Sequence, residues 1–327
     1  MTTDRLDAAP VRPQRTGPGP LDRWYEAAGV RGGVRRMFHA DQERGLVFFP
    51  EALVPHLGHE AVRGLDPGLR RELTIRHLYQ FLLSTTHLET RVVNAAAEAV
   101  ANDRAGLPGL DAALRMDAFK VYCDEGYHAL YSLDLADQVA AATGIPVPAW
   151  DYGGFVDRLA EAGARLLPGE PVLAALLQAV VFETLITAVL NQLPGDPTVV
   201  GTVRTLMRDH AVDEGRHHRF FSLLFQEMWA RLDRPLRIRA ACALPGLIHA
   251  ALTWDLTPVQ GSLRLAGLDR TTALEVVRDS YAGDAARTNE MARATLRLCA
   301  SVGAFDLPGV RDAFAAHGLG DGGVTLP

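Results

Sequence analysis

Apolar residues recur at helical spacing through most of the chain, and the alternating pattern typical of strands is nearly absent. The first long helix is expected to begin at Asp66-Pro67, because aspartate caps a helix and proline fits its first turn. Asp111 opens the second long helix, after a turn that contains glycine and proline. The pattern predicts helices over residues 66–102, 111–142, 151–167, 171–192 and 196–232.

The segments on either side of these helices are less regular. A short helix is predicted over residues 21–30, followed by an irregular stretch to about residue 65. The helical pattern resumes after Pro235, with interruptions predicted at Pro245, Pro258, Gly267 and Gly283. Residues 1–20 and 318–327 are rich in glycine or proline and are expected to be loose tails. The sequence therefore predicts one all-α domain over residues 21–317, with a four-helix core and additional peripheral helices.

The segment 171–190 is apolar and long enough to raise the question of a membrane span. It contains Gln178 and Glu183, and a lone carboxylate near the middle of a bilayer is costly. No second run of this kind occurs, and the mean hydropathy of the chain is +0.03. We therefore expect a buried helix of a soluble bundle, in which the acid has a partner.

Composition narrows the function classes further. The net charge of −6, from 33 basic and 39 acidic residues, argues against nucleic acid as a partner. The three cysteines form no CxxC pair, which fits a reducing compartment, and the N-terminus has no apolar signal segment. A cytoplasmic protein without a membrane anchor is the prediction.

Two short motifs combine a glutamate with a histidine three residues later. Glu125 and His128 lie in the second long helix, within DEGYH, and Glu214 and His217 lie in the fourth, within DEGRH. Because residues i and i+3 share one face of a helix, each pair can bind a metal ion from one side. Carboxylates with two imidazoles favour iron or manganese over structural zinc, which prefers cysteine ligands.

The other two long helices each place one glutamate in an apolar stripe. Glu89 lies 13 residues before Asn102, and Glu125 lies 14 residues after Asp111, so antiparallel helices bring the two acids level. In the second helix pair, Glu183 and Glu214 are level only if the fourth helix is irregular near Gly201 or begins there. Four acids and two histidines then face one another in the bundle.

In this order, Glu89, DEGYH, Glu183 and DEGRH resemble the ferritin-like di-iron carboxylate proteins. His210 stands four residues before Glu214 on the same helix face. This HxxxExxH pattern is similar to that of the p-aminobenzoate N-oxygenase family of arylamine oxygenases, which has three histidines and four carboxylates. The resemblance implies a ferritin-like four-helix bundle. It also implies the metal ligands Glu89, Glu125, His128, Glu183, His210, Glu214 and His217.

Several neighbouring residues are candidates for supporting roles. Asp124 and Asp213 precede the two motif glutamates, and each is expected to orient a ligating imidazole on a neighbouring helix, or else to lie on the helix surface. Arg216 is expected to pair with such an acid. His218 points away from the ligand face. Core or surface positions without a metal are expected for His56, His59, His77 and His87.

The resemblance implies an oxygenase in which two iron ions activate O2 and oxygen passes to an amine nitrogen, giving hydroxylamine, nitroso and nitro products in natural-product biosynthesis. No separate catalytic acid or base is assigned. The one GxGxxG pattern, at residues 318–323, lies in the glycine-rich tail and follows no predicted strand, and the cysteines are too few for an iron–sulfur cluster, so an external electron donor such as a reductase is required. A small-molecule amine and a reductase are the expected partners, and a homodimer is possible in such folds.

The amine is not identified by the sequence. Residues 81–87, which precede Glu89, carry no arginine or lysine, so a carboxylate on the substrate would need an anchor elsewhere. Arg287, Arg293 and Arg297 are the candidates for that anchor, although solvent-exposed positions are the simpler expectation for them. An aliphatic or amino-acid-derived amine therefore stays open beside an arylamine.

Two other functions would use the same residues. One is a di-iron C–H hydroxylase or desaturase that acts on a small or carrier-bound substrate. The other is a non-catalytic, iron-binding ferritin-like protein. The third histidine and the additional C-terminal helices argue against storage, because storage bundles are compact four-helix units.

Overall fold

The computed structural model describes residues 18–40, 45–185, 190, 192–253, 255–282 and 285–320, without the side chains of 285–287. Within these ranges the regular elements are helices, and the one β contact is an isolated parallel bridge between Val47 and Val199. The predicted all-α fold is therefore confirmed. The expected tails fall mostly on residues 1–17 and 321–327, outside the described ranges, and the single domain stays a prediction.

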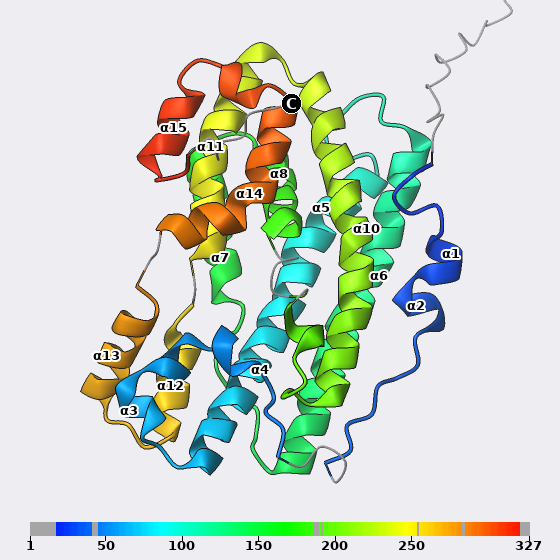
Figure 1. Ribbon diagram of the computed structural model, residues 1–327. Helices are drawn as coiled ribbons and strands as arrows, with labels where there is room; N and C mark the ends of the chain where they lie inside the picture. Colours follow the sequence, from blue (N-terminus) through cyan, green and yellow to red (C-terminus); the bar gives the residue numbers. More distant parts are fainter. Residues whose placement is uncertain are drawn as a thin grey trace, which may run out of the picture.

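Four long helical units run side by side in Figure 1 and form the bundle. They are α4 (Pro67–Leu88) continued by η3 (Glu89–Val93) and α5 (Asn94–Ala101), α6 (Ala112–Thr143), α8 (Pro171–Leu185) and α10 (Gly201–Arg231). The first unit packs on α6, and α8 packs on α10; α6 also contacts α10, and α5 contacts α8. This closed arrangement is the ferritin-like bundle that the motifs predict.

The ends of the bundle helices follow from their sequences. The Asp66 carboxylate accepts a hydrogen bond from the Gly68 N–H (2.7 Å), and Asp111 caps α6 in the same way. Gly144 ends α6 with φ 71°, a left-handed conformation that suits glycine. The fourth unit begins at Gly201 and not at residue 196. This later start is one of the two conditions under which Glu183 and Glu214 were expected to lie at the same height in the bundle.

The first unit contains a π-helical turn that the sequence does not predict. The expected continuous helix over residues 66–102 is instead divided by η3, which starts at Glu89. The Thr90 hydroxyl donates to the carbonyl oxygen of Thr86 (2.6 Å) and so competes with the regular helical ladder at this point. Single π-helical turns within α-helices are frequent at functional sites.

Two hydrophobic clusters fill the bundle, one on each side of a polar layer. One cluster includes Val100, Leu114 and Phe220, and the other includes Leu78, Val139 and Val203. The first unit, α6 and α10 each pass from one cluster to the other through the polar layer that holds the glutamates and histidines, and α8 contributes to the first cluster. The layer is therefore shielded from solvent at both ends of the bundle.

The remaining helices surround the bundle in three groups (Figure 1). On one side lie α7 (Gly154–Leu166), α11 (Arg234–Leu252), α14 (Ala285–Ser301) and α15 (Val310–Ala316). Near one end lie α3 (Glu60–Arg63), α12 (Thr257–Leu265) and α13 (Arg270–Ser280). Beside α6 and α10 lie the short α1 (Trp24–Ala27) and α2 (Gly29–Gly32), where one helix over residues 21–30 was expected. Three short 3-10 turns, Glu51–Leu53, Pro55–Gly58 and Leu193–Gly195, and a fourth at Ala304–Asp306 complete the elements.

Two of the predicted interruptions are wrong. Pro245 lies inside α11 and is buried there, so its packing in the core offsets the hydrogen bond that proline removes from a helix. Pro258 lies in the first turn of α12, where proline is tolerated, and the break comes before it. The break at Gly267 is confirmed, and Gly283 lies outside the described residues.

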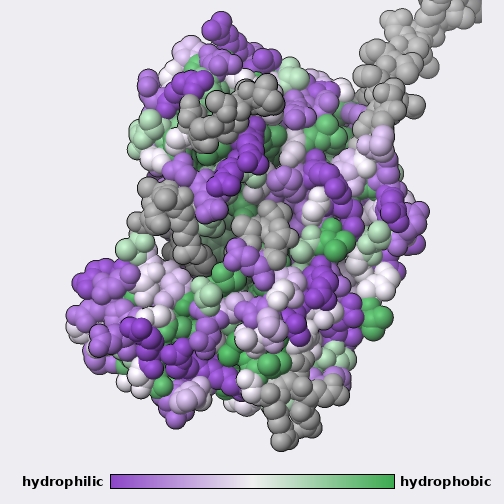
Figure 2. Space-filling model, viewed as in Figure 1, coloured by the Kyte–Doolittle hydropathy of each residue, from purple (hydrophilic) through white to green (hydrophobic). Residues whose placement is uncertain are grey.

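Hydrophilic residues cover most of the face shown in Figure 2, with hydrophobic ones scattered among them. Among the helices that the structure describes, none combines the length and the apolar character that a bilayer span needs. The apolar α8 is instead enclosed by the bundle, as its sequence predicts.

Candidate metal centre

The polar layer brings together seven acidic and histidine side chains from all four units of the bundle. We call this set the acid–histidine cluster: Glu89, Glu125, His128, Glu183, His210, Glu214 and His217. None of the seven is more than 2% exposed. Since ionisable side chains are rarely buried without partners, so dense a group requires a compensating charge.

One half of the cluster is centred on His210. Its Nε2 atom lies 2.9 Å from Glu89 Oε1 and 3.2 Å from Glu214 Oε1. His128 Nδ1 lies 3.7 Å from the same Glu89 oxygen. Ligand atoms of Glu89, His128, His210 and Glu214 all lie within 4.8 Å of one another, a spacing that can hold a metal ion.

The other half is centred on His217. Its Nδ1 atom lies 2.9 Å from Glu125 Oε1 and 3.3 Å from Glu214 Oε1. His128 Nδ1 lies 3.3 Å from Glu125 Oε2. Glu125, His128, Glu214 and His217 form a second group within 4.8 Å, and it shares His128 and Glu214 with the first. The cluster therefore has the form of two adjoining metal sites.

Hydrogen bonds between the side chains do not account for this arrangement. Among the described residues, Glu89 has no hydrogen-bond partner on either carboxylate oxygen, and His210 has none on either ring nitrogen. Glu125 Oε1, Glu183 Oε2 and His217 Nδ1 are also buried without one. Buried polar atoms normally have partners, so these atoms fit cations bound between them.

The ionisation of the acids points the same way. Burial, partly offset by His210, raises the pKa of Glu89 to about 7. Burial, with Glu214 and Glu125 nearby, raises the pKa of Glu183 well above its usual value. Burial thus disfavours the ionised forms of these two acids, and metal cations bound beside them would stabilise those forms.

Two aspartates hold the outer sides of the imidazoles. Asp124 Oδ2 lies 3.1 Å from His217 Nε2, and Trp24 donates its indole N–H to the same carboxylate at 2.9 Å. Asp213 Oδ2 lies 3.2 Å from His128 Nε2, and Arg216 forms an ion pair with Asp213. Each aspartate reaches an imidazole on a neighbouring helix, which turns the Nδ1 atom of that ring toward the centre of the cluster.

Tyr131 was not singled out by the sequence, although it lies three residues after His128 on the same helix face. Its ring centroid lies 5.4 Å from that of His128 and 5.8 Å from that of His210. Its hydroxyl is buried without a hydrogen-bond partner among the described residues. Burial, with the acids of the cluster, raises the pKa of Tyr131 well above its usual value, so the phenol stays protonated.

The family model described as P-aminobenzoate N-oxygenase AurF matches residues 37–303. The match covers most of the chain and includes the whole acid–histidine cluster. The chain belongs to the AurF family. It is therefore an enzyme of an N-oxygenase family with monooxygenase activity, and its buried cluster fits the di-iron character of that family. A search of curated proteins returned no match.

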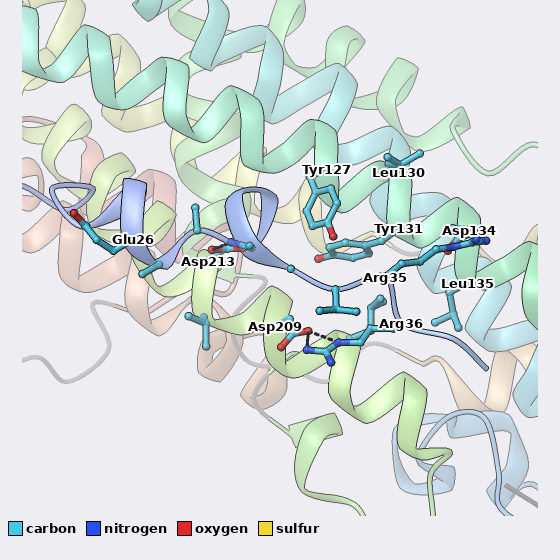
Figure 3. Close-up of a pocket in the computed structure, with 18 residues that line it drawn as sticks. Glu26, Arg35, Arg36, Tyr127, Leu130, Tyr131, Asp134, Leu135, Asp209 and Asp213 are labelled. Carbon is cyan, nitrogen blue, oxygen red and sulfur yellow. Dashed lines mark hydrogen bonds and ion pairs between the residues drawn. The ribbon is translucent and has the colours of Figure 1, made fainter. Parts of the chain in front are cut away.

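In this AurF-family chain, two cavities border the cluster layer on opposite sides. The first, of about 550 Å³, lies between the N-terminal segment and α6 and α10 (Figure 3). Tyr127 and Tyr131 extend from α6 toward that segment, and Arg36 forms an ion pair with Asp209 (2.6 Å). Asp213, which holds His128, also lines this cavity. Its walls are thus rich in charged side chains that are already paired.

The second cavity, of about 250 Å³, is mostly apolar and lies between α4, α7, α8 and the segments near residues 251–255 and 291. Thr85 lies one helical turn before Glu89, and Phe182 directly precedes Glu183; both line the cavity. Figure 2 shows a hollow with a hydrophobic floor near the middle of the face, in the region of these helices. An apolar cavity beside the cluster is suited to an aromatic substrate.

Two of the three proposed arginine anchors, Arg293 and Arg297, do not line this cavity. The side chain of Arg293 is 55% exposed and lies 3.8 Å from Glu290, and Arg297 is also exposed. Both lie on the outer face of α14, whereas Met291 of the same helix lines the cavity. Arg293 and Arg297 are therefore corrected to surface residues. The side chain of Arg287 lies outside the described part of the chain.

The other histidines lie apart from the cluster. The His218 Nδ1 atom lies 3.1 Å from the carbonyl oxygen of Glu183, and the His59 side chain accepts a hydrogen bond at the start of α3. His56 and His77 are buried, and His87 is half-buried. His77 is the one among them that lines the apolar cavity.

Replacing Asp124 with asparagine should weaken Fe(II) binding about 10- to 100-fold, because the neutral amide no longer balances and orients the His217 imidazole. Fe(II) affinity, measured by anaerobic titration, tests this. Asp137→Asn is the control, since Asp137 lies on the same helix but is exposed. Equal affinities for both variants would remove Asp124 from the support of the cluster.

Proposed function

We propose that the chain is a di-iron N-oxygenase that uses O2 and external electrons to oxidise the nitrogen of an arylamine. The observation that carries the proposal is the buried acid–histidine cluster with a third histidine, His210, in a chain of the AurF family. In this proposal the oxidation proceeds from amine through hydroxylamine and nitroso to nitro. Natural-product biosynthesis is the proposed setting.

The seven residues of the cluster would hold two iron ions. Glu214, which belongs to both groups, would contribute to both metal sites, and Glu125, which lies near His128 and His217, would contribute to the second. Glu89 and His210 would complete one site, while Glu183 interacts with Glu125 and Glu214. The bound metals supply the activation of O2 and the transfer of oxygen to the amine.

The chain's own residues would set the conditions for this chemistry. Asp124 and Asp213 would accept hydrogen bonds from the Nε2–H groups of His217 and His128, and so would leave each Nδ1 lone pair free for metal. The hydrophobic clusters above and below the layer exclude bulk water. The apolar cavity beside Thr85 and Phe182 would bind the aromatic ring and direct its amine toward the cluster.

Electrons would come from a separate donor, and a reductase and a small-molecule amine are the proposed partners. Cys123, Cys242 and Cys299 form no disulfide in the structure, in keeping with the proposed cytoplasmic location. Nucleic acid and membrane are not among the proposed partners, because the chain carries a net charge of −6 and the apolar helix α8 is enclosed by the bundle.

The test is anaerobic loading with Fe(II), chemical reduction, and exposure to 18O2 in the presence of a panel of arylamines and aliphatic amines. We expect 18O-labelled hydroxylamine, nitroso or nitro products from arylamines, detected by mass spectrometry. Products hydroxylated at carbon, or desaturated products, would replace the proposal with the alternative oxygenase chemistry. Iron oxidation without any organic product from the panel would point to storage.

A further inference from the structure

The apolar cavity follows one face of α4 over several turns. Its lining residues on this helix are His77, Gln80, Phe81, Ser84, Thr85 and Leu88. This spacing of three and four residues marks a single stripe, which ends next to Glu89 of the cluster. On α4 the cavity lining therefore runs from His77 to Leu88, the residue before Glu89 of the cluster.

The length of this stripe exceeds that of a small aminobenzoate. From His77 to Leu88 the helix rises roughly 16 Å at 1.5 Å per residue. A single benzene ring with one substituent at each end is shorter than two helical turns, which rise roughly 11 Å. A molecule that contacts His77 and also presents its nitrogen to the cluster must therefore be longer than one substituted ring.

His77 is placed to bind a polar group in otherwise apolar surroundings. The residue is 7% exposed and lines the cavity, so part of its ring borders the cavity, while its Nδ1 atom is covered by protein and has no hydrogen-bond partner among the described residues. The ring packs against Phe49 at 4.7 Å and lies 6.0 Å from the His56 ring. His56 in turn lies 2.8 Å from the Tyr281 hydroxyl, so His56 is held in place behind His77.

We infer that the substrate is an extended arylamine whose far end carries a neutral hydrogen-bonding group such as a carboxamide, and that His77 is the specificity-determining residue that binds this group. The inference rests on the proposed function for the role of the amine end. It assigns the other end of the substrate from the cavity and its one buried imidazole.

The charge state of His77 excludes a carboxylate at that end. Burial, with a smaller contribution from His56, lowers the pKa of His77 to about 3, so the imidazole is neutral near pH 7. Burial also lowers the pKa of His56, to about 4. A carboxylate placed beside two neutral imidazoles and phenylalanine rings would lose its hydration without gaining a counter-charge. A neutral amide would lose less hydration and gain a hydrogen bond.

The experiment measures the binding of four amines to the metal-free protein by calorimetry at pH 7.5. The probes are 4′-aminobiphenyl-4-carboxamide, its carboxylate analogue, 4-aminobiphenyl and 4-aminobenzamide. We expect the biphenyl carboxamide to bind about 10-fold or more tightly than the carboxylate and than the short amide. Tighter binding of the carboxylate, or equal binding of the short amide, would overturn the inference.

The role of His77 is tested with His77→Leu and His77→Gln. His77→Leu should weaken the carboxamide about 5- to 10-fold and leave 4-aminobiphenyl unchanged, while glutamine should keep most of the carboxamide affinity. His87→Leu is the matched control, on the same helix but outside the cavity. An equal loss for both ligands in His77→Leu, or a loss that glutamine does not restore, would contradict the specificity role.

Turnover separates this inference from the proposed function. Binding to the metal-free protein tests the cavity and His77 alone. The iron-loaded enzyme, supplied with the same four amines, reductant and O2, tests N-oxygenation. If the binding order holds and no N-oxygenated product forms, the proposed function fails at the chemical step; if N-oxygenation occurs and the binding order is reversed, the substrate assignment fails.

Discussion

Replacing Glu214 with alanine should abolish loading of both iron ions and reduce N-oxygenation by more than the 10- to 100-fold expected for the loss of an outer partner. Glu214 Oε1 lies 3.5 Å from His128 Nδ1, 3.2 Å from His210 Nε2 and 3.3 Å from His217 Nδ1. It is therefore the acid common to both halves of the cluster. Its removal leaves three imidazoles facing one another without the carboxylate that they share.

Iron content after anaerobic reconstitution and desalting measures this effect. Glu227→Ala is the matched control, because Glu227 lies on the same helix, is half-buried and forms an ion pair with the nearby Arg231. Circular dichroism melting of both variants shows whether the fold is kept. Full iron loading of a folded Glu214→Ala protein would refute the two-site reading of the cluster.

Replacing Glu89 with glutamine should stabilise the metal-free protein by about 3 kcal/mol at pH 8 and by less than about 1 kcal/mol at pH 5. Burial raises the pKa of Glu89 from 4.5 to about 7 in the folded chain. Between pH 4.5 and 7 the folded chain therefore binds a proton at Glu89 that the unfolded chain has released. The free energy of unfolding decreases as the pH rises through this range, because folding must then keep a proton on Glu89 or bury its charge. Glutamine removes this loss because it carries no charge.

Urea denaturation of the metal-free protein at the two pH values measures the difference. Glu161→Gln, at an exposed position of α7, is the control and should behave as the wild type does at both. Added Fe(II) should reverse the order, since bound metal stabilises the folded wild type by mass action and glutamine is a poorer ligand. A Glu89→Gln protein no more stable at pH 8 than the wild type would show that the buried acid already has a counter-charge.

The bundle could be predicted because its determinants are local. Asp66 and Asp111 cap the helices whose starts they predict, and the apolar stripe on each helix shows which face packs against the other helices. The glutamates and histidines could be aligned by counting residues from the turns, since a helix rises uniformly. Pro245 shows the limit of local rules: tertiary packing keeps α11 helical through a residue that, taken alone, breaks helices.

Around the cluster, too, the residues close to the motifs in sequence could be predicted, and those that meet only through tertiary packing could not. Asp124 and Asp213 could be expected from their places beside the motif glutamates, one position along the helix. The apolar cavity could not be predicted, because its lining residues come from distant parts of the chain and meet only in the folded molecule. They include Phe49, His77, Phe155, Phe182 and Met291. His77 accordingly reads as an ordinary core histidine until the cavity is known.

The π-helical turn at Glu89–Val93 determines how the cavity-lining face of α4 is rotated relative to the Glu89 side chain. N-terminal to it, α4 presents the cavity stripe that ends at Leu88; within it, Glu89 faces the cluster. Shortening the turn by one residue to a regular α-helix would rotate the two parts against each other by roughly 100°. The π-helical turn thus fixes the orientation of the apolar cavity relative to the metal centre. A change in the length of this turn would alter that orientation while leaving the side chains of the cavity and of the centre the same.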